Sequence, residues 1–172
     1  MDLLHFDPEP LYFEDPLPDG VLELIERAGE HYGAPEAEHA LAEAGLKAPD
    51  HLLVLVARYR YHFYRHQMAE AQRVVWHAID VSGARVGLPA DGGGIDADEV
   101  ATAAHRSMTL TRFYLSALKA AAYIRLREGD ISGAIQILQP LVQIDDADRL
   151  GSKVLLDVAR AAEEASQTPI AI

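Results

Sequence analysis

The sequence contains no cysteine in its 172 residues. This absence excludes disulfide bonds, thiolate metal ligands and a cysteine nucleophile, and it is compatible with a reducing cytoplasm. Basic residues are also scarce: 15 lysines and arginines stand against 27 aspartates and glutamates, which gives a net charge of −12. Because phosphate contacts require clustered lysine and arginine, neither a nucleic acid nor an anionic membrane is expected as the main partner.

Long apolar runs are missing too. No window reaches the roughly 18 apolar residues that a membrane span requires. The first twenty residues have neither the basic start nor the apolar run of a signal peptide, so we expect a cytoplasmic protein. The length suits one compact domain with a core of its own.

Motifs of catalysis are likewise lacking. There is no G-x-S-x-G sequence, and the glycine-rich stretch GLPADGGGIDADE has neither the lysine of a phosphate-binding loop nor the ligand alternation of a calcium loop. We read residues 83–97, which include most of this stretch, as a flexible insertion loop that can move when a partner binds. No enzymatic activity and no cofactor are expected.

Proline marks residues 1–18 as an N-terminal arm outside the helices. Proline lacks an amide donor and biases the preceding residue towards extended backbone. Leu11, Tyr12 and Phe13 are apolar enough to pin this arm against the domain. The four prolines concerned are Pro8, Pro10, Pro16 and Pro18.

From Asp19 onwards the apolar residues follow a helical period, and nothing alternates with the period of a strand. The pattern predicts about seven helices in one domain over residues 19–168. Two of them span residues 50–66 and 67–82, and another ends before Gly45. Helix resumes near Ala97 and runs to Glu128 with a break around residues 107–111. A capping helix covers residues 149–167.

A 34-residue period relates parts of the chain. Ala37 and Ala71 lie 34 residues apart, and each is followed by apolar residues four and seven positions later. A third copy starts at Ala134, displaced from Ala71 by one period and an insertion of 29 residues. A small residue at this position lets two antiparallel helices approach closely, while the two later residues pack between neighbouring hairpins. The followers are Leu41 and Ala44, Val75 and Ala78, and Leu138 and Leu141.

The period, the small–large–small spacing and the segment LREGDISGAIQIL resemble tetratricopeptide repeats. The resemblance covers residues 18–49, 50–83 and 115–148. It implies an all-α stack of antiparallel hairpins in a right-handed superhelix. His66 and Tyr32 stand where the turn glycine of that family is expected, and the early tryptophan of the first helix is absent from every copy.

In tetratricopeptide arrays the first helix of each hairpin lines a concave groove that receives a partner segment. The resemblance therefore implies a non-catalytic interaction module, such as a bacterial adaptor, assembly factor or chaperone. The implied groove residues combine cations and aromatics without a carboxylate, which favours a partner with acidic groups and an apolar anchor. Tyr59, by contrast, is assigned to the hairpin core. The implied partner-binding residues are Arg60, Phe63, Tyr64, Ser116, Lys119, Tyr123 and Arg127.

Two alternatives belong to other classes. His62 and His66 lie four apart, a spacing used by two-histidine metal sites, and with His77 they suggest a metal- or cofactor-handling accessory protein. The expected turn at His66 and the lack of a spaced third ligand weigh against it. The other alternative is a homo-oligomer in which the apolar tail TPIAI, or the arm, fills a neighbouring groove.

Overall fold

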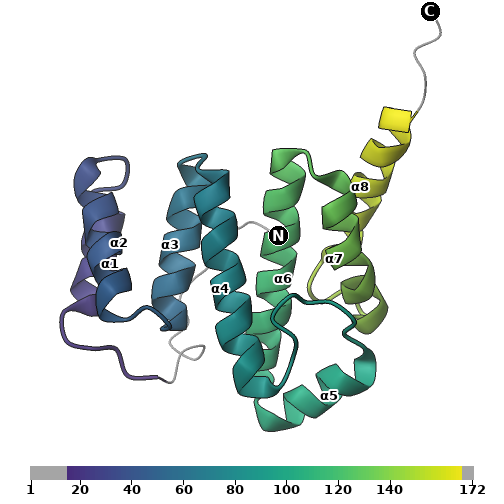
Figure 1. The fold of residues 1–172 in the computed structure, drawn as a ribbon, viewed down its shortest axis with the longest axis horizontal. Coiled ribbons are helices and arrows are strands. Elements are labelled where there is room, and N and C mark those ends of the chain that lie inside the picture. Colours follow the sequence, from purple (N-terminus) through teal and green to yellow (C-terminus); the bar gives the residue numbers. More distant parts are fainter. Residues whose placement is uncertain (1–14, 168–172) are drawn as a thin grey trace, which may run out of the picture.

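A computed structural model describes residues 15–167 of the chain. In this range the chain forms eight α-helices and no strand (Figure 1), which confirms the predicted all-α class. There is one helix more than expected, because residues 97–128 divide into two at Ser107. The helices are α1 (Val21–Glu30), α2 (Pro35–Lys47), α3 (Leu52–Tyr64), α4 (Met68–Val86), α5 (Ala97–Arg106), α6 (Met108–Glu128), α7 (Ile131–Ile144) and α8 (Ser152–Gln167).

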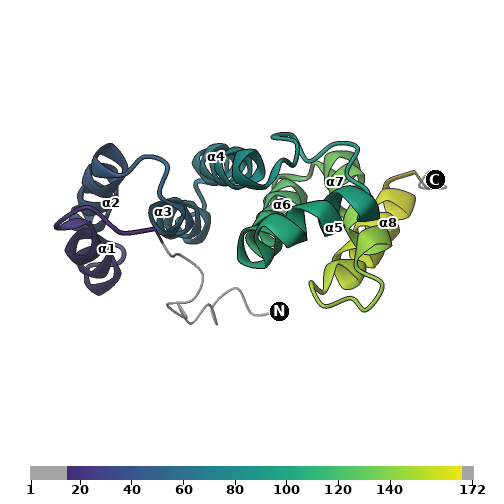
Figure 2. The same ribbon diagram turned by 90° about the horizontal axis from the view of Figure 1, so that it is seen from below.

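The helices stand side by side as hairpins in a row. Helices α1 and α2, α3 and α4, and α6 and α7 form the pairs, and α8 packs against α7. Seen end-on, α1, α3 and α6 lie on one side of the row and α2, α4 and α7 on the other (Figure 2). The first hairpin falls within the predicted repeat 18–49, whereas the second runs three residues past the repeat 50–83 and the third begins seven residues before the repeat 115–148. Helix α6 packs against α4 across the insertion. Helix α3 and helix α6 are therefore neighbours on one side of the row.

The small residues of the predicted repeat lie at the helix contacts. Ala37, Ala71 and Ala134 have no exposed surface. The residues four and seven positions later are also buried in all three copies. The periodicity in the sequence therefore reports helix packing, as its spacing predicted.

The core comprises three apolar clusters along the row. The first joins α1 and α2 to Val54 and Tyr61 of α3, and the largest lies among α3, α4 and α6. The third joins α6 and α7 to Leu156 of α8. Tyr59 packs at the edge of the largest cluster, as the sequence predicted, although its side chain is only partly buried.

All three turns between paired helices use left-handed backbone, and the turn between α1 and α2 does so at Gly33 with a φ of 94°. His66 follows α3 with a φ of 59°, and Gly129 follows α6 with a φ of 84°. These are the two positions that the repeat alignment equates. A side chain such as that of His66 adopts this conformation at a cost that glycine avoids. The break predicted around residues 107–111 occurs at Ser107, whose hydroxyl accepts a hydrogen bond from the Leu110 amide at 3.2 Å.

The predicted insertion loop differs from the structure in extent and in packing. Helix α4 continues to Val86, and the non-helical segment covers only residues 87–96. Leu88 and Ile95 in this segment are buried. The Tyr114 hydroxyl donates to the Pro89 carbonyl oxygen at 2.7 Å. Apolar residues among the glycines thus tie the segment to α4 and α6, and its movement on partner binding stays a prediction.

Helix α2 also extends beyond its predicted end. Gly45 lies inside the helix, and the Arg58 guanidinium occupies the space beside it: a Cβ at Gly45 would lie 2.8 Å from Arg58 Nη1. Burial, followed by the charge of Arg73, lowers the pKa of Arg58. Gly45 thus serves a close contact between α2 and α3, where the sequence suggested a helix end.

The predicted N-terminal arm falls mostly outside the described residues, as do Leu11, Tyr12, Phe13 and the TPIAI tail. Residues 15–18 are non-helical, as the prolines predicted. No helix in the described range is both long and apolar enough to cross a membrane.

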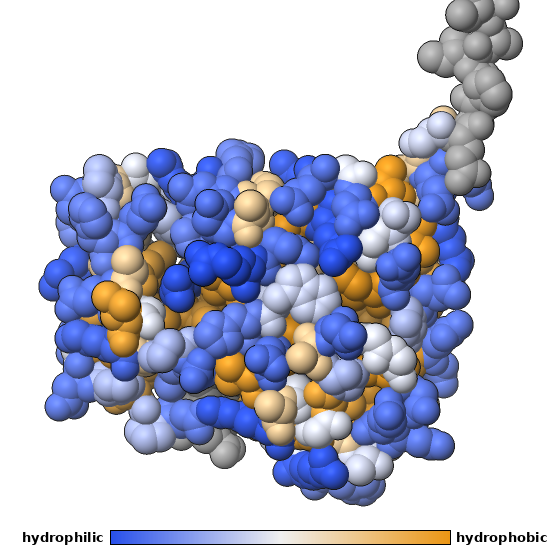
Figure 3. Space-filling view, viewed as in Figure 1, coloured by the Kyte–Doolittle hydropathy of each residue, from blue (hydrophilic) through white to orange (hydrophobic). Residues whose placement is uncertain are grey.

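The surface drawn in Figure 3 carries apolar areas that hydrophilic side chains separate from one another. The large apolar side chains that are most exposed come from several elements and do not form one face. They are Leu22, Tyr32, Leu46, Met108, Val154 and Val158.

Candidate functional site

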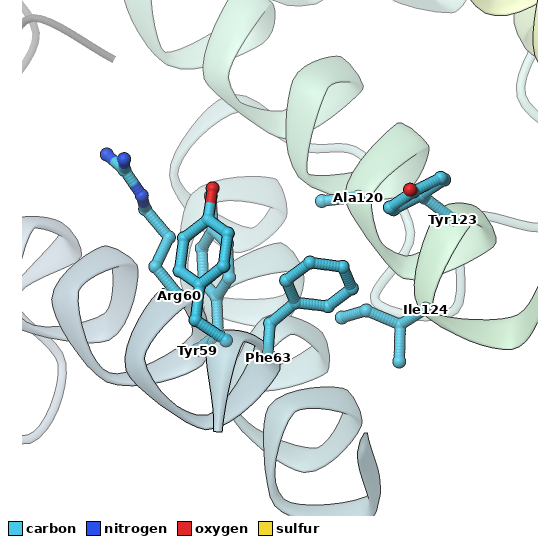
Figure 4. A pocket seen from close by; sticks show the side chains of 7 residues that line it. Tyr59, Arg60, Phe63, Ala120, Tyr123 and Ile124 are labelled. Carbon is cyan, nitrogen blue, oxygen red and sulfur yellow. The ribbon is translucent and has the colours of Figure 1, made fainter. Parts of the chain in front are cut away.

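A pocket opens between the C-terminal half of α3 and the C-terminal half of α6 (Figure 4). It is open to solvent and has a cavity volume of about 20 Å³, and its walls are almost wholly apolar. Helix α3 presents one series of lining residues and α6 the other, each at the three- or four-residue spacing of a single helix face. The lining residues are Tyr59, Arg60, Phe63, Tyr64, Ala120, Tyr123 and Ile124.

Phe63 is the central side chain of the pocket. It reaches from α3 towards Ile124 and Tyr123 of α6 (Figure 4), and its ring centroid lies 5.6 Å from that of Tyr123. On its own helix it contacts Tyr64 edge-on, with ring centroids 5.4 Å apart. This arrangement leaves aromatic surface partly exposed between two helices. Partly exposed, rigid aromatic rings are typical anchors of protein interfaces.

Two arginines border the aromatic surface. Arg60 extends from α3 to the side of the gap (Figure 4), and the Arg127 Cζ lies 5.9 Å from the centroid of the Phe63 ring. The second distance is within the range of a cation–π interaction. No carboxylate lines the pocket among the described residues. The chain has a net charge of −12, so a pocket bordered by arginines and free of carboxylates differs from the acidic composition of the chain as a whole.

The structure brings together most of the predicted partner-binding residues. Arg60, Phe63, Tyr64 and Tyr123 line the pocket, and Arg127 lies over Phe63. Ser116 lies further towards the start of α6, half-buried and outside the pocket.

Lys119 differs from its expected place. Its side chain is buried, and its Nζ donates a hydrogen bond to the Leu150 carbonyl oxygen in the turn between α7 and α8. Burial lowers the pKa of Lys119, while Asp148 and Asp145 act in the opposite direction. Lys119 therefore stabilises the turn before α8 and does not line the pocket. The sequence prediction missed this, because a repeat register gives no information on a contact with a turn that is distant in sequence.

Three lining residues were not predicted as partner-binding. Ala120 and Ile124 follow from the helical period once Tyr123 and Arg127 are placed on one face of α6. Tyr59 was assigned to the core, and it contributes to both the core and the pocket wall.

The Tyr64 hydroxyl is buried and has no hydrogen-bond partner within residues 15–167. A buried hydroxyl without a partner is unfavourable by about 1–3 kcal/mol.

Tyr59 predicts how stability depends on alkaline pH. Burial raises its pKa to about 12, with Arg60 acting in the opposite direction and Tyr64 in the same direction. An unfolded tyrosine loses its proton near pH 10. The folded state thus retains a proton that the unfolded state releases, so the stabilisation present below pH 10 is lost as pH rises to 12.

We expect Tyr59→Phe to reduce this loss by about 2 kcal/mol, measured as the free energy of unfolding in urea between pH 9 and pH 11.5. Tyr32→Phe is the matched control, because Tyr32 is exposed. Tyr114 contributes a similar loss in every variant, since burial also raises its pKa. If the free energy of unfolding falls with pH as steeply in Tyr59→Phe as in the unchanged chain, the raised pKa of Tyr59 is contradicted.

Two of the three histidines of the metal alternative have other side-chain partners. His62 Nδ1 lies 2.8 Å from Gln67 Oε1, and His77 Nε2 lies 2.7 Å from Asp50 Oδ1. His66 is in the turn beyond α3, so the pair does not share a continuous helix. Over residues 15–167 no three histidine or carboxylate side chains gather in a way that could hold a metal ion.

The fold and the pocket define an all-α protein of packed helical hairpins with an aromatic pocket on one side. A protein of Azotobacter chroococcum mcd 1, described as "Uncharacterized 19.8 kDa protein in nifW 5'region", is 42% identical to the chain over 158 residues. The alignment covers 92% of this chain and 88% of the relative, so the chain belongs to the same bacterial family. No protein-family model and no solved structure matches the sequence.

Proposed function

We propose that the chain is a non-catalytic interaction module of the tetratricopeptide type, which binds a segment of a partner protein in the α3–α6 pocket. The observation that carries the proposal is the pocket itself: partly exposed aromatic rings bordered by Arg60 and Arg127, with no carboxylate among its lining residues. Aromatic residues and arginine supply most of the binding energy in protein interfaces.

The pocket chemistry defines the partner segment. An apolar side chain would pack against Phe63 and Tyr123, and a carboxylate would pair with Arg60 or Arg127. A short segment that combines an apolar anchor with acidic groups meets these requirements, and the module would act as an adaptor, assembly factor or chaperone for the protein that carries it.

The gene region of the relative supplies a first partner to test. Its name places it in the region 5′ of nifW. The product of nifW is therefore the first bait, followed by proteins that co-purify from a bacterial host of the chain.

The test reverses the charge at the pocket in the double variant Arg60→Glu/Arg127→Glu. We expect at least a tenfold loss of partner capture, with an unchanged helical circular dichroism signal. The matched control is Arg65→Glu/Arg149→Glu, which makes the same change in net charge at two exposed positions outside the pocket. Equal capture by the two double variants would refute the pocket as the docking site.

A further inference from the structure

We propose that residues 1–14 of the same chain occupy the α3–α6 pocket and that a partner must displace them. This inference rests on the proposed role of the pocket as a docking site. It adds an intramolecular competitor, and hence a means of regulating access. Three observations support it: the point at which this segment joins the domain, its length, and its chemistry.

The segment joins the domain beside α3. Asp15 forms an ion pair with Arg85 of α4, and its carbonyl oxygen accepts a hydrogen bond from His51 Nε2 at 3.0 Å. The other ring nitrogen of His51 accepts a hydrogen bond from the Leu53 amide at 3.3 Å, so the same imidazole caps α3. Asp15 is thus fixed at the start of the helix whose second half lines the pocket.

The length of the segment is sufficient. Helix α3 rises about 1.5 Å per residue, so Phe63 lies roughly 18 Å along the helix axis from His51. Fourteen residues of extended chain span up to roughly 46 Å. The segment therefore reaches every part of the pocket with residues to spare.

The chemistry of the segment matches that of the pocket. Residues 1–14 contain four carboxylates and neither lysine nor arginine. Two groups of large apolar residues lie on either side of Pro8 and Pro10: Leu3, Leu4 and Phe6, and Leu11, Tyr12 and Phe13. Prolines favour the extended backbone that groove-bound segments adopt. The segment thus has the acidic groups and apolar anchors that Arg60, Arg127 and Phe63 would bind.

Tethering strengthens such a contact. A short flexible tether gives an effective concentration on the order of 1 mM, so a segment with a dissociation constant of about 10 µM as a free peptide would fill about 99% of the pockets. A partner would then bind about 100-fold more weakly than it binds an empty pocket.

The test measures binding of a fluorescent peptide of residues 1–14 to the full chain by fluorescence anisotropy. Leu3, Leu4 and Phe6 lie far enough from Asp15 to reach Phe63. The chain with its own segment intact is therefore compared with the full-length variant Leu3→Ser/Leu4→Ser/Phe6→Ser. We expect the variant to bind the peptide at least tenfold more tightly, because its pocket is empty. Adding Arg60→Glu/Arg127→Glu to this variant should abolish binding, and adding Arg65→Glu/Arg149→Glu should not.

Several results would overturn the inference. Equal peptide binding by the chain and its serine variant would show that the pocket is not filled in cis. Binding that survives Arg60→Glu/Arg127→Glu would place the segment elsewhere. A dimer in light scattering that the serine substitutions dissociate would make the occupant the segment of a second copy.

Partner capture separates this inference from the proposed function. Capture that requires Arg60 and Arg127 but does not rise in the serine variant overturns the intramolecular occupant and leaves the docking site standing. Partner capture that requires Arg60 and Arg127 and rises in the serine variant supports both the docking site and its occupation by residues 1–14.

Discussion

Lys119→Glu is expected to destabilise the chain by about 3 kcal/mol or more. The substitution removes the donor to the Leu150 carbonyl oxygen. It also buries a carboxylate close to Asp145 and Asp148, whose charges now favour the ammonium group. The free energy of unfolding in urea, followed by circular dichroism, measures the loss.

Two further variants resolve its cause. Lys119→Met keeps the apolar stem of the side chain and should lose only about 1–2 kcal/mol, the value of the hydrogen bond. Lys153→Glu reverses an exposed charge in the first turn of α8 and should change stability by less than about 0.5 kcal/mol. A Lys119→Glu protein as stable as the Lys153→Glu protein would show that Lys119 does not hold the turn before α8.

Gly83→Ala is the second large effect, with an expected loss of about 2 kcal/mol. Gly83 is buried inside α4, and a Cβ there would lie 2.8 Å from the Leu88 carbonyl oxygen and 3.0 Å from Tyr114 Cε2. Neither neighbour can move freely, because the Tyr114 hydroxyl is hydrogen-bonded to Pro89 in the same segment. Thermal unfolding should show the loss as a lower Tm.

The control for this variant is Gly29→Ala in α1. Gly29 is exposed, and no atom lies within 4 Å of the position that its Cβ would take. Alanine is favoured over glycine in a helix by about 0.5–1 kcal/mol, so this variant should be equally or more stable. If Gly83→Ala were stabilising like the control, the close approach of α4 to residues 88 and 114 would not be a constraint.

Helix content and helix pairing could be predicted from the sequence because they depend on local signals. The repeat, with a period of 34 residues and an insertion of 29 before its third copy, located Ala37, Ala71 and Ala134 at helix contacts, and all three are buried. The alignment of His66 with Gly129 located two turns with the same backbone conformation. Periodicity and turn chemistry act within a few residues, so one sequence suffices to detect them.

Glycine was a less reliable guide. Gly45 and Gly83 were taken as signs of a helix end, yet both lie inside helices where another group approaches closely. A glycine that ends a helix and a glycine that admits a neighbour look the same in sequence. Only the position of that neighbour, Arg58 in one case and Tyr114 in the other, distinguishes them.

The site could be predicted only where it depends on the geometry of a single helix. The face of α3 that carries Arg60, Phe63 and Tyr64 follows from helical geometry, and these residues do line a pocket. The direction of the Lys119 side chain depends on the turn near Leu150, which is remote in sequence. Tertiary contacts of this kind are not encoded in the period of a repeat.

The insertion between the second and third hairpins has a consequence for folding kinetics. Helices α4 and α6 pack against each other, although residues 87–107 separate them in sequence. Closing a loop of this length costs about 2 kcal/mol more conformational entropy than closing the short turn within a hairpin. Folding can start in the hairpins at either end of the row and then extend to neighbouring helices. We expect the docking of α6 onto α4 to be the slowest of these steps, because it closes the longest loop.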